Sequence, residues 1–163
     1  MTFTDAQLDA LIACEKQVKE APRKEMKSER GYLRNDMALE SPDGKHRFRV
    51  FMRQSEEFPE NFSIGLDYFP GEDPGSFCML RCNGKHGGTK VHAHHAVFHI
   101  HRSLAADINA GLKAERSIAT TTAYGAYRDA LAHFCKLVNV LEADTYFPGL
   151  NQALLFTDQP TAP

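Results

Sequence analysis

The first twenty residues carry an apolar pattern that is typical of a helix. Apolar side chains recur there at helical spacing: Leu8, Leu11, Ile12 and Val18. Thr4 and Gln7 have the spacing of a capping box, in which each side chain covers a backbone amide of the other residue. Pro22 cannot continue a helix. The pattern therefore predicts an N-terminal helix that begins after Thr4 and ends shortly before Pro22.

The next part of the chain alternates with a period of two, as strands do. Residues 45–53 place apolar side chains at most even positions and mainly cationic ones at odd positions. Residues 33–40 alternate in the same way, and the sequence Ser41-Pro42-Asp43-Gly44 between the two runs is typical of a turn. We expect a hairpin here, followed by three more strands at residues 62–68, 76–82 and 95–101.

The last third of the chain has one strong pattern. From residue 123 to 140 the apolar positions recur at steps of three and four, which predicts a helix that packs on a sheet. These positions are Tyr124, Tyr127, Leu131, Phe134, Val138 and Leu141. Residues 103–111 suit a short helix, residues 112–121 favour no element, and we expect a loose tail after about residue 157.

The order of these elements indicates the fold class. A helix, about five strands joined by short links, and a second helix favour an α+β fold with an antiparallel meander. We expect the N-terminal and C-terminal helices to cover one face of the sheet, and residues 1–163 to form a single domain.

Composition narrows the function classes. The chain has 163 residues, 42% hydrophobic residues and a net charge of -2, which is unlike a generally basic nucleic-acid-binding protein. The N-terminus lacks the basic region of a signal peptide, and no apolar run reaches the roughly 18 residues of a membrane span. The four cysteines form no Cys-x-x-Cys pair. We therefore expect a cytoplasmic protein that does not contact a membrane.

The histidines are unevenly distributed. Six of the eight lie between His86 and His101, in a segment from Arg81 to Arg102 that contains four basic residues and no Asp or Glu. Residues 56–73 contain six acidic residues and no Lys or Arg. The nearly neutral total therefore conceals a local cationic, histidine-rich region.

This region suggests contact with a phosphate-bearing partner. If the strands at 45–53 and 95–101 share a sheet, Arg47, Arg49 and Arg53 share a face with His95, His99 and His101. Arginine binds phosphate in a fork geometry, and histidine exchanges protons near neutral pH. We therefore expect RNA as a partner. The candidate catalytic residues are His86, His99, His101 and Asn83, and the candidate phosphate contacts are Arg47, Arg49, Arg53, Arg81 and Arg102. Whether the protein is an enzyme stays open; the activity compatible with this set is that of a metal-independent ribonuclease.

The same histidines allow a second interpretation. His92-x-His94 and His99-x-His101 each place two imidazoles on one side of an extended chain, and imidazole binds zinc and other divalent transition metals. The alternative to an RNA-acting protein without a cofactor is therefore a non-enzymatic module that binds a metal or a partner. A third reading is a purely structural hydrogen-bond network. His46 and His133 lie outside the segment, and we expect them to be structural.

One part of the chain resembles a known group of proteins. Arg81-Cys82-Asn83-Gly84-Lys85-His86, then His94-His95 and Phe98-His99-Ile100-His101, resembles a group of uncharacterised small bacterial proteins and, more distantly, the TumE-type toxins of toxin–antitoxin pairs. The similarity covers roughly residues 61–103. Cys82 and Gly84-Lys85 differ from the toxin pattern, which also has a proline before the histidines. The resemblance implies a compact α+β domain, a single histidine site and an antitoxin-like protein partner.

Overall fold

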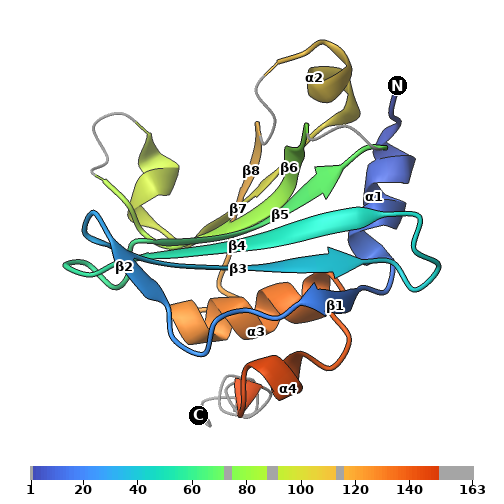
Figure 1. The fold of residues 1–163 in the computed structure, drawn as a ribbon. Coiled ribbons are helices and arrows are strands. Elements are labelled where there is room, and N and C mark those ends of the chain that lie inside the picture. Colours follow the sequence, from blue (N-terminus) through green and yellow to red (C-terminus); the bar gives the residue numbers. More distant parts are fainter. Residues whose placement is uncertain (1, 72–74, 88–91, 113–115, 151–163) are drawn as a thin grey trace, which may run out of the picture.

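The computed structural model describes residues 2–71, 75–87, 92–112 and 116–150. Its elements in chain order (Figure 1) are α1 (Asp5–Ala13), β1 (Gln17–Glu20), β2 (Lys27–Glu29), β3 (Tyr32–Glu40), β4 (Arg47–Ser55), β5 (Phe62–Phe69), β6 (Phe77–Asn83), the 3-10 helix η1 (Ala93–Ala96), β7 (His99–Arg102), α2 (Ala105–Asn109), β8 (Ser117–Thr120), α3 (Tyr127–Leu137) and α4 (Ala143–Tyr146). The tail expected after residue 157 lies outside the described residues.

The described strands form one antiparallel sheet of eight strands in an α+β fold. The order is β1-β3-β4-β5-β6-β7-β8, and β2 pairs with β3 beside β1. The predicted α+β class and antiparallel sheet are confirmed, but the sheet is larger than the predicted five strands. The extra strands β1, β2 and β8 have only four, three and four residues. A period of two cannot be recognised over so short a run.

The predicted hairpin is the connection between β3 and β4. Gly44 has a φ of +72°, which an L side chain rarely adopts, and its amide donates a 2.8 Å hydrogen bond to the Ser41 carbonyl. In β4 the even side chains Phe48, Val50 and Met52 are buried, while the odd arginines are exposed. The two faces of this strand are therefore those that the alternation predicted.

The N-terminal helix has the predicted capping box but is shorter than predicted. Thr4 accepts a hydrogen bond from the Gln7 amide, and the Gln7 side chain accepts one from the Thr4 amide. The helix ends at Ala13, because Cys14 is extended and the Lys16 amide bonds to the Asn139 carbonyl. Val18, which the helical pattern had included, lies in β1.

The helices α1 and α3 lie on one side of the sheet, and η1 lies on the other side (Figure 1). The buried cluster joins Leu8 and Leu11 of α1 and Leu131 and Phe134 of α3 to the even-numbered side chains of the central strands. The C-terminal helix begins at Tyr127, later than predicted, because the backbone of Ala126 is extended. Tyr124, which is buried, lies before the helix. The prediction that helices cover one face agrees with this arrangement.

The segment predicted as a strand over residues 95–101 is divided. The amide of His95 bonds to the carbonyl of His92, and the amide of Val97 bonds to that of His94, which closes the turn of η1. The strand β7 begins only at His99. The expectation that His95 lies on a strand face was therefore wrong, while His99 and His101 do lie on one.

Candidate metal centre

The sheet register brings residues of four strands into two rows on the face opposite α1 and α3. In one row Arg53, Ser63, Asn83 and His99 are successive cross-strand partners. In the next row the partners are Phe51, Gly65, Arg81 and His101. These eight residues are called the histidine face below. The predicted sharing of a face holds for Arg47, Arg49 and Arg53 of β4 and for His99 and His101 of β7.

The described residues on both sides of η1 lie over this face. The amide of His86, after β6, donates a 2.8 Å hydrogen bond to the carbonyl of His95. The ring centroids of His86 and His95 are 4.4 Å apart, and those of His94 and His99 are 5.0 Å apart. All six histidines of the segment therefore form one group of neighbouring rings, called the histidine cluster: His86, His92, His94, His95, His99 and His101.

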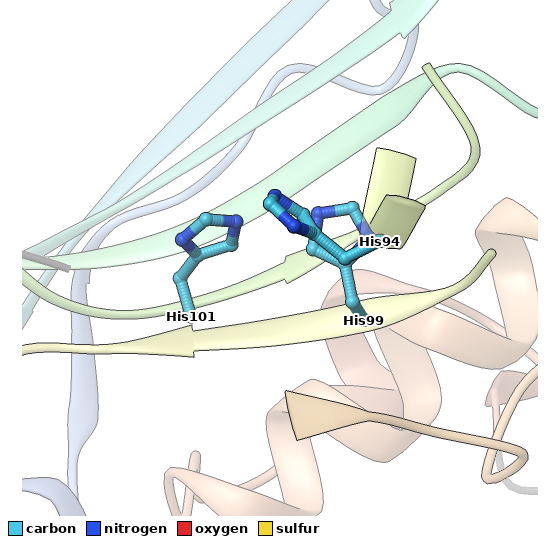
Figure 2. Close-up of side chains that lie close together, drawn as sticks. All are labelled: His94, His99 and His101. Atoms are coloured by element: carbon cyan, nitrogen blue, oxygen red, sulfur yellow. The ribbon is translucent and has the colours of Figure 1, made fainter. Parts of the chain in front are cut away.

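Three of these rings are close enough to share a metal ion. His94, His99 and His101 each offer one ring nitrogen, and the three nitrogens lie within 4.8 Å of one another. Figure 2 shows the rings of His99 and His101 rising side by side from β7, with His94 reaching between them from η1. His99 is completely buried, His101 is 9% exposed and His94 is half-buried. Two of the three rings are thus held by a strand and shielded from water.

Neighbouring groups fix the orientation of the His99 ring. Its Nδ1 lies 2.8 Å from the Val97 carbonyl oxygen, which can only accept, so Nδ1 carries the proton. This leaves Nε2 with a free lone pair, the form in which imidazole binds a metal. The Asn83 amide nitrogen lies 3.3 Å from Nε2, and Ser63 donates a 2.7 Å hydrogen bond to the Asn83 amide oxygen. The amide is therefore a long, weak partner that a metal ion would displace.

His86 lies beside the lone pair of His99 Nε2. Its Nε2 lies 3.3 Å from Nε2 of His99. Two imidazole nitrogens on one tetrahedral zinc ion are also about 3.3 Å apart, given Zn–N bonds of about 2.0–2.1 Å. The observed separation therefore suits a hydrogen bond between the rings and equally suits two ligands of one ion.

Three rings of the cluster favour the neutral form. Burial, followed by the neighbouring His95, lowers the pKa of His86 to about 4. Burial also lowers the pKa of His95 and that of His99. A ring that stays neutral at pH 7 keeps the lone pair that a metal requires, without competition from a proton.

The five arginines expected to contact phosphates do not lie together. Arg49 pairs with Asp67 at 2.6 Å, Arg102 pairs with Asp9, and Arg47 donates to the carbonyl of Gly71. Arg53 and Arg81 instead line a cavity of about 310 Å³ beside the histidine cluster. In the described part of the chain, these two of the five therefore share a cavity with the candidate catalytic residues Asn83 and His86.

The other predicted residues divide in the same way. Asn83 is buried at the end of β6 and His86 lies just beyond it, so both reach His99. His92 is exposed and stacks on His94, outside the group of three. His46 bonds to Tyr68 and His133 packs against Tyr124, in keeping with structural roles.

Two supporting residues were missed by the sequence analysis. Ser63 orients Asn83, and the Tyr124 hydroxyl donates a 2.9 Å hydrogen bond to the His99 carbonyl from the opposite side of the sheet. The sequence pattern predicts for Tyr124 only a position in an apolar helical stripe. No local signal marks these roles, since they depend on residues 20 and 25 positions away.

Two further findings concern the chain as a whole: its helices and its similarity to known proteins. Among the described helices, none has the length and hydropathy that a bilayer crossing requires. No protein-family model, no curated protein and no solved structure matches this chain.

Proposed function

We propose that this protein binds a divalent transition-metal ion, zinc foremost, through His94, His99 and His101. The observation that carries the proposal is the convergence of three ring nitrogens within 4.8 Å on a largely buried site. Zinc prefers nitrogen ligands in tetrahedral geometry and has no redox chemistry, so a site made of imidazoles alone suits it.

The support from the His99 ring is independent of that convergence. A hydrogen bond from the distal ring nitrogen to a backbone carbonyl is the usual way in which proteins orient a metal-binding histidine. His99 has this bond to Val97. Burial keeps its ring neutral, which removes the cost of displacing a proton when the metal binds.

Three imidazoles leave one position of a tetrahedral ion free. In zinc enzymes this position holds a water molecule whose pKa falls to near 7, so that it can act as a nucleophile. His86 is the neighbour suited to this position, either as a fourth ligand or as the partner of a bound water. The two arrangements correspond to a structural site and to a hydrolytic site.

The test is the metal content of protein purified without a histidine tag. We expect about one zinc ion per chain after dialysis against zinc, measured by plasma mass spectrometry, and loss of that ion in His94→Ala. His94 is the best variant because it is half-buried and lies on η1, so the sheet does not depend on it.

The matched control is His92→Ala, which changes an exposed histidine two positions away in the same loop. It should retain the ion, because His92 is outside the group of three. Equal zinc content in wild type and His94→Ala would contradict the proposed ligand set. Absence of zinc from a folded wild type would contradict the proposed function.

An RNA-acting protein without a metal is the second candidate. It is favoured by one observation: Arg53, Arg81, Asn83 and His86 line one cavity. Arg53 and Arg81 were expected to contact phosphates, and Asn83 and His86 are among the candidate catalytic residues. Since Arg47, Arg49 and Arg102 are engaged within the chain, the expected contact is smaller than the sequence alone predicted.

Binding of a single-stranded RNA in EDTA across a salt series tests this second candidate. Binding through phosphates must weaken as salt rises, in proportion to the number of contacts. Binding that is absent at low salt, or that does not change with salt, would exclude it.

A further inference from the structure

The cavity beside the histidine cluster has an unusual lining. It measures about 310 Å³, near the lower size of small-molecule sites, and is lined by Tyr32, Arg53, Asn61, Phe62, Ser63, Arg81, Asn83 and His86. Arg53 and Arg81 contribute to this lining, and none of these eight residues is acidic. The lining is therefore cationic, which favours an anionic ligand.

Arg53 contributes a positive charge that an anion in this cavity would neutralise. Among the described residues its guanidinium has a ring contact with Phe51, at 5.7 Å, and no ion pair. Its cross-strand partner on β3 is Arg34, so two like charges lie directly opposite each other on one face. Such a pair is destabilising unless an anion joins it.

The nearest carboxylate on β3 does not supply that anion. Asp36 lies two residues from Arg34 on the same face, and its cross-strand partner is Phe51. Neither Arg34 nor Arg53 forms an ion pair with it in the described part of the chain. The neighbouring Arg49 is different, because Asp67 neutralises it at 2.6 Å.

The cavity also adjoins the candidate metal ligands. His86 and Asn83 line it, and each has a nitrogen 3.3 Å from Nε2 of His99. A group bound between Arg53 and Arg81 would therefore lie next to the metal site, with His86 between the two. Tyr32, at the outer end of β3, adds an aromatic wall for an uncharged part of the ligand.

We propose that this cavity binds the phosphate group of a small organic molecule, which is the substrate or ligand of the metal centre. A phosphate is favoured over a carboxylate because two arginines, a histidine and an amide all line the cavity, and phosphate offers three terminal oxygens to such donors. The assignment as substrate rests on the proposed metal function; the binding of the phosphate does not.

The experiment is a calorimetric titration of inorganic phosphate into EDTA-treated protein and into zinc-loaded protein. We expect Arg53→Gln to weaken phosphate binding by about tenfold or more, since an arginine–phosphate contact is charge-assisted. Arg53 is exposed, so the variant should fold, and its zinc content should equal that of wild type.

The matched control is Arg47→Gln, on the same face of the same strand. Arg47 donates to the Gly71 carbonyl and does not line the cavity, so phosphate binding should change less than about twofold. Acetate should not displace phosphate. Preference for acetate, or binding of an RNA oligonucleotide in place of phosphate, would overturn the assignment.

The titration separates this proposal from the metal site. Zinc bound as expected, with phosphate binding absent or unchanged in Arg53→Gln, would overturn the phosphate site and leave the metal centre. Phosphate that binds zinc-free protein and depends on Arg53 supports the phosphate site, even where zinc does not bind.

Discussion

At the scale of residues, the same side chain type has different roles in different surroundings. His99 and His133 both have a pKa that burial lowers, but only His99 has other imidazoles around it. His133 packs on Tyr124 on the helix-covered side, with Lys136 nearby. Burial alone therefore does not mark a functional histidine; the neighbouring ligand atoms do.

His133 gives a pH prediction that does not involve the histidine cluster. Because its pKa is lower in the folded than in the unfolded chain, the unfolded chain binds more protons as the pH falls below about 6.5. The free energy of unfolding of wild type should therefore fall, relative to His133→Gln, between about pH 7.5 and about pH 5. Urea unfolding in EDTA at each pH measures the difference.

Gln is polar and does not titrate, so the variant removes the proton equilibrium of His133 and keeps a polar group at that position. The prediction would be contradicted if the free energy of unfolding of wild type minus that of His133→Gln stayed constant with pH, or if it increased as the pH fell.

At the scale of elements, a buried lysine joins the ends of two helices. The ammonium of Lys16 donates to the carbonyls of Ile12 and Cys14 at the end of α1, and to that of Val138 at the end of α3. Burial lowers the pKa of Lys16 to about 8, so it is still mostly charged at pH 7. Charge at this position suits the carbonyl ends of both helices.

Replacing this lysine should be costly. Lys16→Met keeps most of the apolar stem but leaves three carbonyls without their donor, so we expect a loss of about 2–3 kcal/mol in the free energy of unfolding. Chemical denaturation measures it. The control is Lys19→Met, which removes a surface ion pair with Glu40 and should lower the free energy of unfolding much less than Lys16→Met does. Equal losses would show that Lys16 does not join the helices.

The end of β6 depends on a glycine in close contact with backbone. A Cβ atom on Gly84 would lie 1.9 Å from the Glu60 carbonyl oxygen, which cannot rotate away, and 2.7 Å from the Phe62 ring. This close approach sets where His86 begins to fold over the sheet. A larger residue must therefore displace the loop that carries His86.

Gly84→Ala should lower the free energy of unfolding by about 1–3 kcal/mol. The control, Gly125→Ala, adds a Cβ atom with nothing within 4 Å and no positive φ, so thermal denaturation should show little change. The same stability for both variants would mean that the contact at Gly84 relaxes without cost.

At the scale of the whole molecule, the hydrophobic core and the candidate binding residues lie on opposite faces of the sheet. The face under α1 and α3 is apolar, and the histidine face carries the candidate metal ligands, Arg53 and Arg81. Because β7 contributes to both faces, its position links them: the Tyr124 hydroxyl fixes the His99 carbonyl from the apolar side. Binding at the histidine cluster should therefore affect global unfolding.

Zinc should raise the melting temperature of the protein, since a ligand that binds only the folded state stabilises it by about 2.7 kcal/mol at a hundredfold excess over Kd. Scanning calorimetry with zinc and then with excess EDTA measures the shift and its reversal. His94→Ala should show no shift. A shift of equal size in His94→Ala would assign the stabilisation to zinc bound elsewhere.

Much of the fold follows from local patterns. The alternation in residues 45–53 predicted which side chains of β4 are buried, because a strand has only two faces. The helix cap at Thr4 depends on a residue three positions away. The short strands β1, β2 and β8 were not predictable in this way, since tertiary pairing rather than their own sequence stabilises them.

The sequence by itself determined that six histidines lie in one acid-free segment, and period two predicted that His99 and His101 share a face with Arg47, Arg49 and Arg53. The resemblance to TumE-type toxins, and with it an antitoxin-like partner, stays a prediction. None of these inferences required a distance between residues far apart in the chain.

Only the tertiary structure decided which of these residues meet. The fold of η1 over β7 brings His94 to His99 and His101, because backbone bonds at His86 and Val97 turn the chain back. Pairing with carboxylates 18 and 93 residues away removes Arg49 and Arg102 from the set of available cations. A metal site and an anion site depend on three-dimensional convergence, which local periodicity does not encode.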